Sequence, residues 1–295
     1  MKLRHEIIYL STPHGRMREA AGPGDPAATA ATTNTGRMRV VVLRPEGQTG
    51  PLPGILWIHG GGYAMGFPEM VYASCGHLAA RRFGAVVLSP DYRRSWQAPY
   101  PAALIDCYRT LLYMKAHAAE LGIRDDQIFV GGESAGGGLC AALCMLAHDL
   151  GTVQIAAQMP LYPMLDSLDT ASSAHNHLDP TWGTWRNHAA WGLYLRRPKG
   201  ERGAVNCYAS PSRRRDYRGL PPCYSFVCRD EPFHDETVAF MERLNAAGVE
   251  AKLDVWPGNY HAFDMLLITP KARAARQAFA RWYDYARQNY FAPQR

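Results

Sequence analysis

The feature that most constrains the fold is a serine set between a predicted buried strand and a predicted helix. An apolar run over residues 127–131 predicts the strand, and residues 138–146 predict the helix. Between them, residues 132–136 read Gly-Glu-Ser-Ala-Gly, with the serine at Ser134. A tight strand-to-helix turn requires small neighbours, and it presents the hydroxyl beside the free N–H groups of the helix N-terminus. The alternative interpretation is a glycine-rich turn with only a structural role. Other motifs must therefore decide whether Ser134 is catalytic.

A second motif follows another strand candidate upstream. Residues 54–58 are apolar, and residues 59–63 read His-Gly-Gly-Gly-Tyr. Three glycines leave backbone N–H groups free to face a substrate oxygen, which becomes an anion in the tetrahedral intermediate of acyl transfer. A flexible loop leaving the sheet is the other interpretation. In combination with the serine turn, the motif favours an oxyanion hole.

The candidate general base is His261, one of eleven histidines. It lies in a loop after the alternating run 251–256, downstream of Ser134. Serine, acid and histidine is the chain order found in α/β-hydrolases. His59 is the other candidate, but its place beside the glycine loop favours a bracing role.

The acid is expected between the serine and the histidine. Residues 223–228 predict a strand, and Asp230 and Glu231 follow it in the loop before a helix that begins near Pro232. Neighbouring residues point in different directions, so only one of the two carboxylates can face His261.

Together the motifs resemble the hormone-sensitive-lipase-like branch of the α/β-hydrolases, the bacterial family IV esterases. Five segments carry the resemblance, which runs from about Arg37 to the C-terminus. They are the HGGG-aromatic motif at 59–63, the D-Y-R … Y-P-A-A segment at 91–103, the G-D/E-S-A-G-G turn at 132–137, the D-P-L-x-D-E segment at 230–236 and the P-G-x-x-H-x-F segment at 257–263. The resemblance implies an α/β-hydrolase fold, with a mostly parallel central sheet, helices on both faces and a small cap insertion.

The same resemblance implies roles for individual residues. Ser134 corresponds to the nucleophile and His261 to the base, and the amides of Gly61, Gly62 and Ala135 correspond to the oxyanion hole.

The residue before the proline is usually aspartate in the family, whereas here it is Glu231. Register favours Glu231 as the triad acid, with Asp230 as the alternative. Glu133 is interpreted as a brace under the serine turn.

We expect one domain over residues 1–295, with two peripheral parts. Residues 1–36 form an N-terminal arm that contains a strand-like run and an Ala/Thr-rich stretch typical of a flexible surface loop. An N-terminal helical cap, frequent in the family, is therefore not expected, and the cap would come mainly from an insertion at about 164–206. Trp182 and Trp185 fall in this insertion, where they could form its core or an aromatic wall that narrows the acyl pocket. They and Tyr63 of the glycine motif are the predicted substrate contacts.

Composition indicates the cellular location of the protein and its charged partners. Seven cysteines without a CxxC pair favour reduced thiols and a cytoplasmic location, and no run has the length of a secretory signal or a membrane span. The net charge of +6 gathers partly at Arg213, Arg214, Arg215 and Arg218, where a solvated loop is favoured over a patch for acidic partners. No nucleic-acid motif accompanies these arginines.

A metal site is the weaker alternative for one loop. His175, His177 and Asp179 could lie on one side of an extended segment as ligands, but we expect neither a metal nor another cofactor.

These observations predict a serine carboxylesterase that hydrolyses small, short-acyl esters through an acyl-enzyme intermediate. Its expected partner is a small-molecule ester, without nucleic acid or membrane, and a homodimer is left open. The enzyme alternatives are a deacetylase of sugars or other small acetylated compounds and an amide or formamide hydrolase with the same residues. The alternative outside enzymes is a ligand-binding protein of the same fold.

Overall fold

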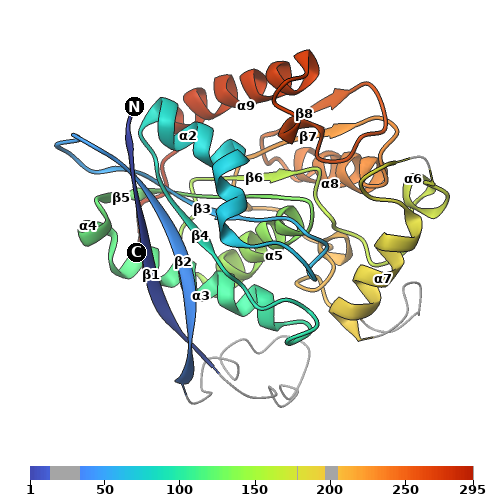
Figure 1. Ribbon diagram of the computed structural model, residues 1–295, viewed down its shortest axis with the longest axis horizontal. Helices are drawn as coiled ribbons and strands as arrows, with labels where there is room; N and C mark the ends of the chain where they lie inside the picture. Colours follow the sequence, from blue (N-terminus) through green and yellow to red (C-terminus); the bar gives the residue numbers. More distant parts are fainter. Residues whose placement is uncertain (14–33, 178, 197–204, 295) are drawn as a thin grey trace.

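A single sheet runs through the computed structural model, which describes residues 1–13, 34–177, 179–196 and 205–294 (Figure 1). Its strands follow the order β1-β2-β4-β3-β5-β6-β7-β8. β1 pairs antiparallel with β2 and β2 with β4, while the neighbours from β4 to β8 run parallel. The strands are β1 (Leu3–Pro13), β2 (Asn34–Pro45), β3 (Leu52–Ile58), β4 (Val86–Pro90), β5 (Ile123–Glu133), β6 (Ala157–Leu161), β7 (Cys223–Cys228) and β8 (Ala251–Trp256).

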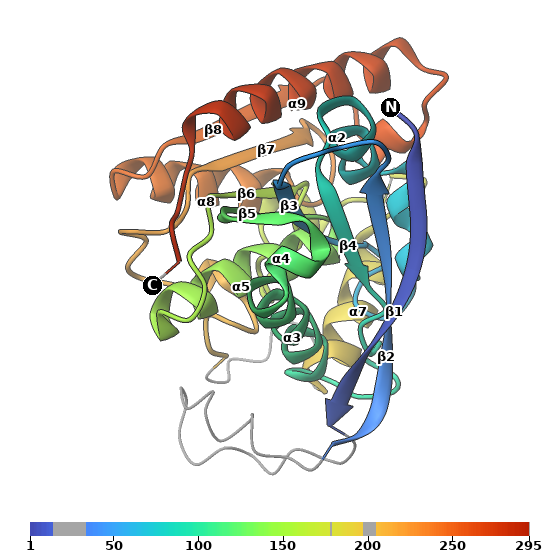
Figure 2. The ribbon, with the colours of Figure 1, turned by 90° about the vertical axis from the view of Figure 1, so that its left-hand side faces the viewer.

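Helices cover both faces of this sheet (Figure 2). α2 and α9 pack on one face, and α3, α5 and α8 pack on the other. The described helices are α2 (Cys75–Phe83), α3 (Ala102–Ala116), α4 (Ala118–Leu121), α5 (Ala135–Leu150), α6 (Ala171–Ala174), α7 (Thr184–Leu195), α8 (His234–Ala246) and α9 (Pro270–Asn289), with 3₁₀ turns η1 (Pro68–Ala73), η2 (Pro211–Arg213) and η3 (Phe263–Met265).

The sequence explains why the sheet is covered on both sides. In β2, Val40 and Val42 pack with α3 and α5, whereas Val41 and Leu43 pack with α2 and α9. Successive side chains of a strand point to opposite faces, so a continuous apolar run must be buried on both. The predicted architecture, a mostly parallel central sheet with helices on both faces, is confirmed.

Parallel strands place their carboxyl ends at one edge of the sheet, and ligands of open α/β sheets bind there. The glycine loop follows β3, and Ser134 lies directly between β5 and α5. The loops that carry Glu231 and His261 follow β7 and β8. The topology therefore brings four distant segments to a common edge.

Two expected peripheral parts fall partly outside the described residues. The N-terminal run is a strand, β1, and the Ala/Thr-rich stretch at 14–33 lies outside the described residues. The chain between β6 and β7 contains α6 and α7, which lie together at one side of the molecule in Figure 1. None of the helices in the described ranges is long and apolar enough to cross a bilayer.

Candidate active site

Ser134 occupies a sharp turn between β5 and α5. Its backbone has φ 57° and ψ −120°, a conformation that is strained for a residue with a side chain. Main-chain hydrogen bonds hold it there, since its N–H donates to Leu161 O at 3.0 Å and its carbonyl accepts from Gly138 N at 3.0 Å. A Cβ on Gly136 would lie 2.1 Å from Ile58 O, so the turn requires the glycine that the motif supplies.

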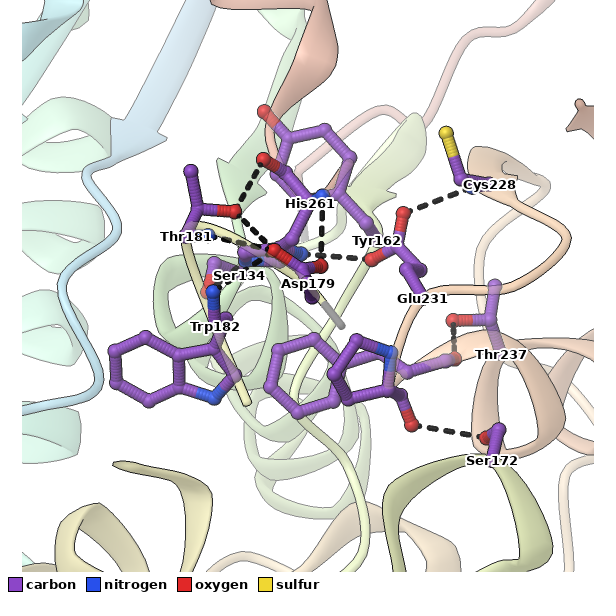
Figure 3. Close-up of polar contacts among 12 residues, drawn as sticks. Ser134, Tyr162, Ser172, Asp179, Thr181, Trp182, Cys228, Glu231, Thr237 and His261 are labelled. Atoms are coloured by element: carbon purple, nitrogen blue, oxygen red, sulfur yellow. Dashed lines mark hydrogen bonds and ion pairs between the residues drawn. The ribbon is translucent and has the colours of Figure 1, made fainter. Parts of the chain in front are cut away.

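Ser134, His261 and Glu231 form a continuous hydrogen-bonded chain (Figure 3). Ser134 Oγ lies 2.9 Å from His261 Nε2, and His261 Nδ1 lies 2.7 Å from Glu231 Oε1. All three residues are buried. An ionised carboxylate can only accept, so Nδ1 carries the imidazole proton and Nε2 is free to accept from the serine. The geometry is that of a nucleophile, a base and an orienting acid.

The surroundings distinguish the two candidate acids. Glu231 is fully buried, and its Oε2 accepts a hydrogen bond from Cys228 N at 2.8 Å. Burial raises the pKa of Glu231, and the charge and hydrogen bond of His261 oppose that rise. Asp230 is exposed, with its backbone N–H donating to Gly258 O at 3.0 Å. The structure thus places Glu231, rather than Asp230, against the imidazole.

The other candidate base, His59, takes no part in this hydrogen-bonded chain. Its Nδ1 is 2.7 Å from Gly60 O, and its ring stacks on Tyr92 with the centroids 4.2 Å apart. Burial lowers the pKa of His59 to about 4. A neutral, stacked ring at the root of the glycine loop suits the bracing role.

The glycine loop lies directly beside the serine, since a Cβ on Gly60 would be 3.3 Å from Ser134 Cβ. Gly61 and Gly62 have φ of 119° and 58°, and a Cβ on Gly61 would lie 2.3 Å from Met65 O. Only glycine fits such a path without displacing the backbone. Ala135 is the first residue of α5, so its N–H has no acceptor within the helix. The three predicted amides therefore come from two segments that meet at Ser134.

Of the three predicted substrate contacts, the structure brings only Trp182 to the triad. Its ring lies against the glycine loop, since a Cβ on Gly62 would be 2.2 Å from Trp182 Cη2, and its centroid is 6.4 Å from that of His261. Tyr63 is buried instead, with its ring 3.9 Å from that of Tyr194 and its hydroxyl donating to Met164 O at 2.9 Å. Trp185 is 78% exposed on α7.

Asp179, one of the three residues considered as metal ligands, is hydrogen-bonded to the main chain. Among the residues that the structure describes, no three His, Cys, Asp or Glu side chains group as a metal site would. Both carboxylate oxygens of Asp179 accept hydrogen bonds from main-chain N–H groups, one of which belongs to His261. This contact was missed by the sequence analysis, although an Asp-Pro-Thr stretch at 179–181 is a signal for a turn closed by an aspartate side chain.

Glu133, predicted to brace the turn, ends β5 and is buried near Asp264. Burial, together with repulsion from Asp264, raises the pKa of Glu133 well above its usual range. Asp264 in turn accepts a hydrogen bond from the hydroxyl of Tyr162 at 2.7 Å, and the rings of Tyr162 and His261 pack edge to face with their centroids 5.0 Å apart.

Three arginines of the basic loop are paired with carboxylates. Arg213 pairs with Asp166 at 3.0 Å, Arg214 with Asp149 at 2.7 Å and Arg218 with Asp216 at 2.7 Å. Local carboxylates therefore neutralise three of its charges.

Comparison with known proteins places the chain in a family. A family model described as the alpha/beta hydrolase fold matches residues 55–265. The chain is 30% identical over 231 residues to Carboxylesterase NlhH of Mycobacterium tuberculosis, covering 76% of this chain and 70% of that relative. It is 31% identical over 289 residues to an acetyl-hydrolase of Streptomyces hygroscopicus, covering 92% and 87%. A solved bacterial heroin esterase superposes with a TM-score of 0.81 at 32% identity, covering 96% of this chain and 84% of that one.

The chain therefore belongs to the α/β-hydrolase fold family, in its hormone-sensitive-lipase-like esterase branch. It is a carboxylic ester hydrolase, as the sequence predicted.

Proposed function

We propose that this enzyme hydrolyses small, short-acyl esters through a covalent acyl-enzyme on Ser134. The single observation that carries the proposal is the hydrogen-bonded chain from Ser134 through His261 to Glu231, with distances of 2.9 and 2.7 Å.

Acylation follows from this arrangement. His261 Nε2 takes the hydroxyl proton as Ser134 Oγ attacks the ester carbonyl carbon. Glu231 stabilises the imidazolium that forms and holds its tautomer. The tetrahedral intermediate collapses when His261 returns the proton to the leaving alkoxide, which departs as the alcohol.

Deacylation repeats these steps with water in place of serine. His261 removes a proton from water as its oxygen attacks the acyl carbon, and the proton then returns to Ser134 Oγ as the acid leaves. In both halves the carbonyl oxygen carries negative charge. The amides of Gly61, Gly62 and Ala135 are the proposed donors to it, because preorganised N–H groups require no reorganisation during the reaction.

The short-acyl preference rests on Trp182. Trp182 is only 7% exposed and its ring lies against Gly62, so this aromatic ring narrows the space beside the oxyanion loop. Each buried methylene contributes about 0.8 kcal/mol while it fits, but displacing packed groups costs about 1–3 kcal/mol. We expect kcat/KM to peak between acetyl and hexanoyl esters. Removal of acetyl groups from a small compound is the second candidate, favoured by the long match to an acetyl-hydrolase.

The test is the Ser134→Ala variant, with Ser212→Ala as the control serine outside the site. Ser134→Ala should lose about a millionfold in kcat and all labelling by a fluorophosphonate, because the triad acts as a unit. Ser212→Ala should label and turn over like the wild type. A Ser134→Ala enzyme that keeps about a tenth of the activity would remove the serine from its role.

A cytoplasmic location is part of the same proposal. The seven cysteines are all unpaired in the structure, which supports a reducing, cytoplasmic environment. Sedimentation velocity would test the homodimer that the sequence left open.

A further inference from the structure

The segment between α6 and α7 is hydrogen-bonded to both the N–H and the carbonyl group of His261. Asp179 Oδ2 accepts a hydrogen bond from His261 N at 2.9 Å, and the Thr181 hydroxyl lies 2.9 Å from His261 O (Figure 3). Asp179 and Thr181 lie 82 and 80 positions before His261 in the chain. The contact is therefore tertiary, between the inserted segment and the loop after β8.

Asp179 is built into this position by further bonds. Its Oδ1 accepts from Thr181 N at 2.7 Å and from Trp182 N at 3.0 Å. The Thr181 hydroxyl also lies 2.6 Å from Oδ1, so its one proton is shared between this carboxylate and His261 O. Asp179 is only 6% exposed. A buried carboxylate is costly unless it is hydrogen-bonded, and the donors here meet that requirement.

The backbone around His261 lacks regular structure that could hold it instead. β8 ends at Trp256, and η3 begins at Phe263. The residue after the histidine, Ala262, has φ 58°, in the left-handed region. The side chain of His261 is fixed at its two ring nitrogens, but the ring can keep those bonds only if its Cα stays in place.

We propose that Asp179 and Thr181 are positioning residues that hold the main chain of His261, so that Nε2 stays within hydrogen-bonding reach of Ser134. This inference rests on the proposed function, in which His261 is the general base. A displacement of about 1 Å in a base costs up to about 10²-fold in rate, because proton transfer needs the reacting atoms in register. The same turn seats Trp182 against Gly62, so one short segment contacts both the base and the oxyanion loop.

The sharpest test removes one hydroxyl. Thr181→Val keeps the shape of the side chain and should lower kcat for p-nitrophenyl acetate about tenfold, with KM changed less than about twofold. Thr181→Ser restores a hydroxyl and should recover most of the loss. The matched control is Thr184→Val, because Thr184 begins α7 directly after this segment and its hydroxyl donates to Ser173 O at 2.9 Å, not to His261. Thr184→Val should keep the wild-type kcat even if its thermal midpoint falls.

A second variant tests the carboxylate. Asp179→Asn cannot present acceptors to both Thr181 N and His261 N, so we expect a larger loss in kcat, about 10²-fold, again with little change in KM. Thermal unfolding of each variant identifies any loss that is due to misfolding.

The outcomes separate this inference from the proposed function. Wild-type kcat in Thr181→Val, or an equal loss in Thr184→Val, would overturn the positioning role. Persistent activity in Ser134→Ala would instead overturn the proposed function, whatever Thr181→Val shows. A loss in Thr181→Val that appears in KM alone would mean that the hydroxyl serves substrate binding, and it would likewise overturn the positioning role.

Discussion

Replacing Glu231 by glutamine should cost this enzyme most of its turnover while leaving its shape unchanged. Glutamine has the same shape as glutamate, and its amide oxygen can still accept the hydrogen bond from Cys228 N. However, it carries no charge. His261 Nδ1 lies 2.7 Å from Glu231 Oε1, and both residues are buried. In the reaction the imidazole becomes a cation, and in Glu231→Gln that cation would be formed without its counterion.

The magnitude follows from the burial of the pair. Breaking a buried ion pair by removing one partner costs about 3–5 kcal/mol. At about 1.4 kcal/mol for each factor of ten, that corresponds to a loss of about 10² to 10⁴ in kcat. Glu231→Asp keeps the charge but shortens the side chain by one methylene, so we expect a smaller loss, about 10- to 100-fold. Asp230→Asn should change kcat less than about twofold, because Asp230 is exposed and its side chain is not at the imidazole.

Steady-state hydrolysis of p-nitrophenyl acetate, with the burst amplitude as the count of acylating sites, measures all three variants. Urea unfolding gives their free energies of unfolding, so a loss of folded protein is separated from a loss of chemistry. A Glu231→Gln enzyme that keeps more than about a tenth of kcat, or a greater loss in Asp230→Asn, would refute the assignment of the acid.

Three further predictions concern the acyl pocket, stability and metals. Trp182→Ala should move the peak of kcat/KM to longer p-nitrophenyl esters across a series of about two to sixteen carbons, whereas Trp185→Ala should not, because that ring is 78% exposed. Burial raises the pKa of Glu133 in the folded protein. The folded protein therefore holds this proton more tightly than the unfolded chain, whose glutamate pKa is about 4.3. The resulting stability is fully present below that pH and is lost as the pH rises through the pKa of the folded state. Thermal midpoints measured from about pH 5 to about pH 9 should therefore fall less in Glu133→Gln than in the wild type. Activity should survive exhaustive EDTA treatment, and a loss restored by zinc would return His175 and His177 to consideration as ligands.

Local motifs were sufficient for the parts of the site that depend on local backbone geometry. The serine turn needs a small residue wherever backbones nearly touch, and Gly136 shows that requirement directly. Consecutive residues determine this local geometry, so the turn and the glycine loop could be located from the sequence alone. The start of β5 was harder, because Arg124 and its acidic neighbours hid the first residues of a strand that begins at Ile123.

The direction of side chains in the inserted segment could not be read from the sequence. Trp182 and Trp185 are three residues apart, yet one is buried at the triad and the other faces solvent. Tyr63 follows the glycine loop, but its ring is buried in the core, where it stacks on Tyr194, more than a hundred positions away in the chain. These outcomes are decided by tertiary packing, which no local pattern records.

The turn at residues 179–182 has a consequence for how acyl specificity can be altered. Trp182 N donates to the same carboxylate, Asp179, that accepts from His261 N. A substitution that enlarges the acyl pocket at Trp182 can therefore shift the turn, and with it the base. The two effects differ in their dependence on substrate: a wider pocket changes the relative rates of long and short esters, whereas a displaced His261 lowers kcat by the same factor for every chain length. The acetyl ester occupies least of the pocket, so its kcat reports the displacement of His261. The ratio of kcat for each longer ester to kcat for the acetyl ester reports the widening of the pocket.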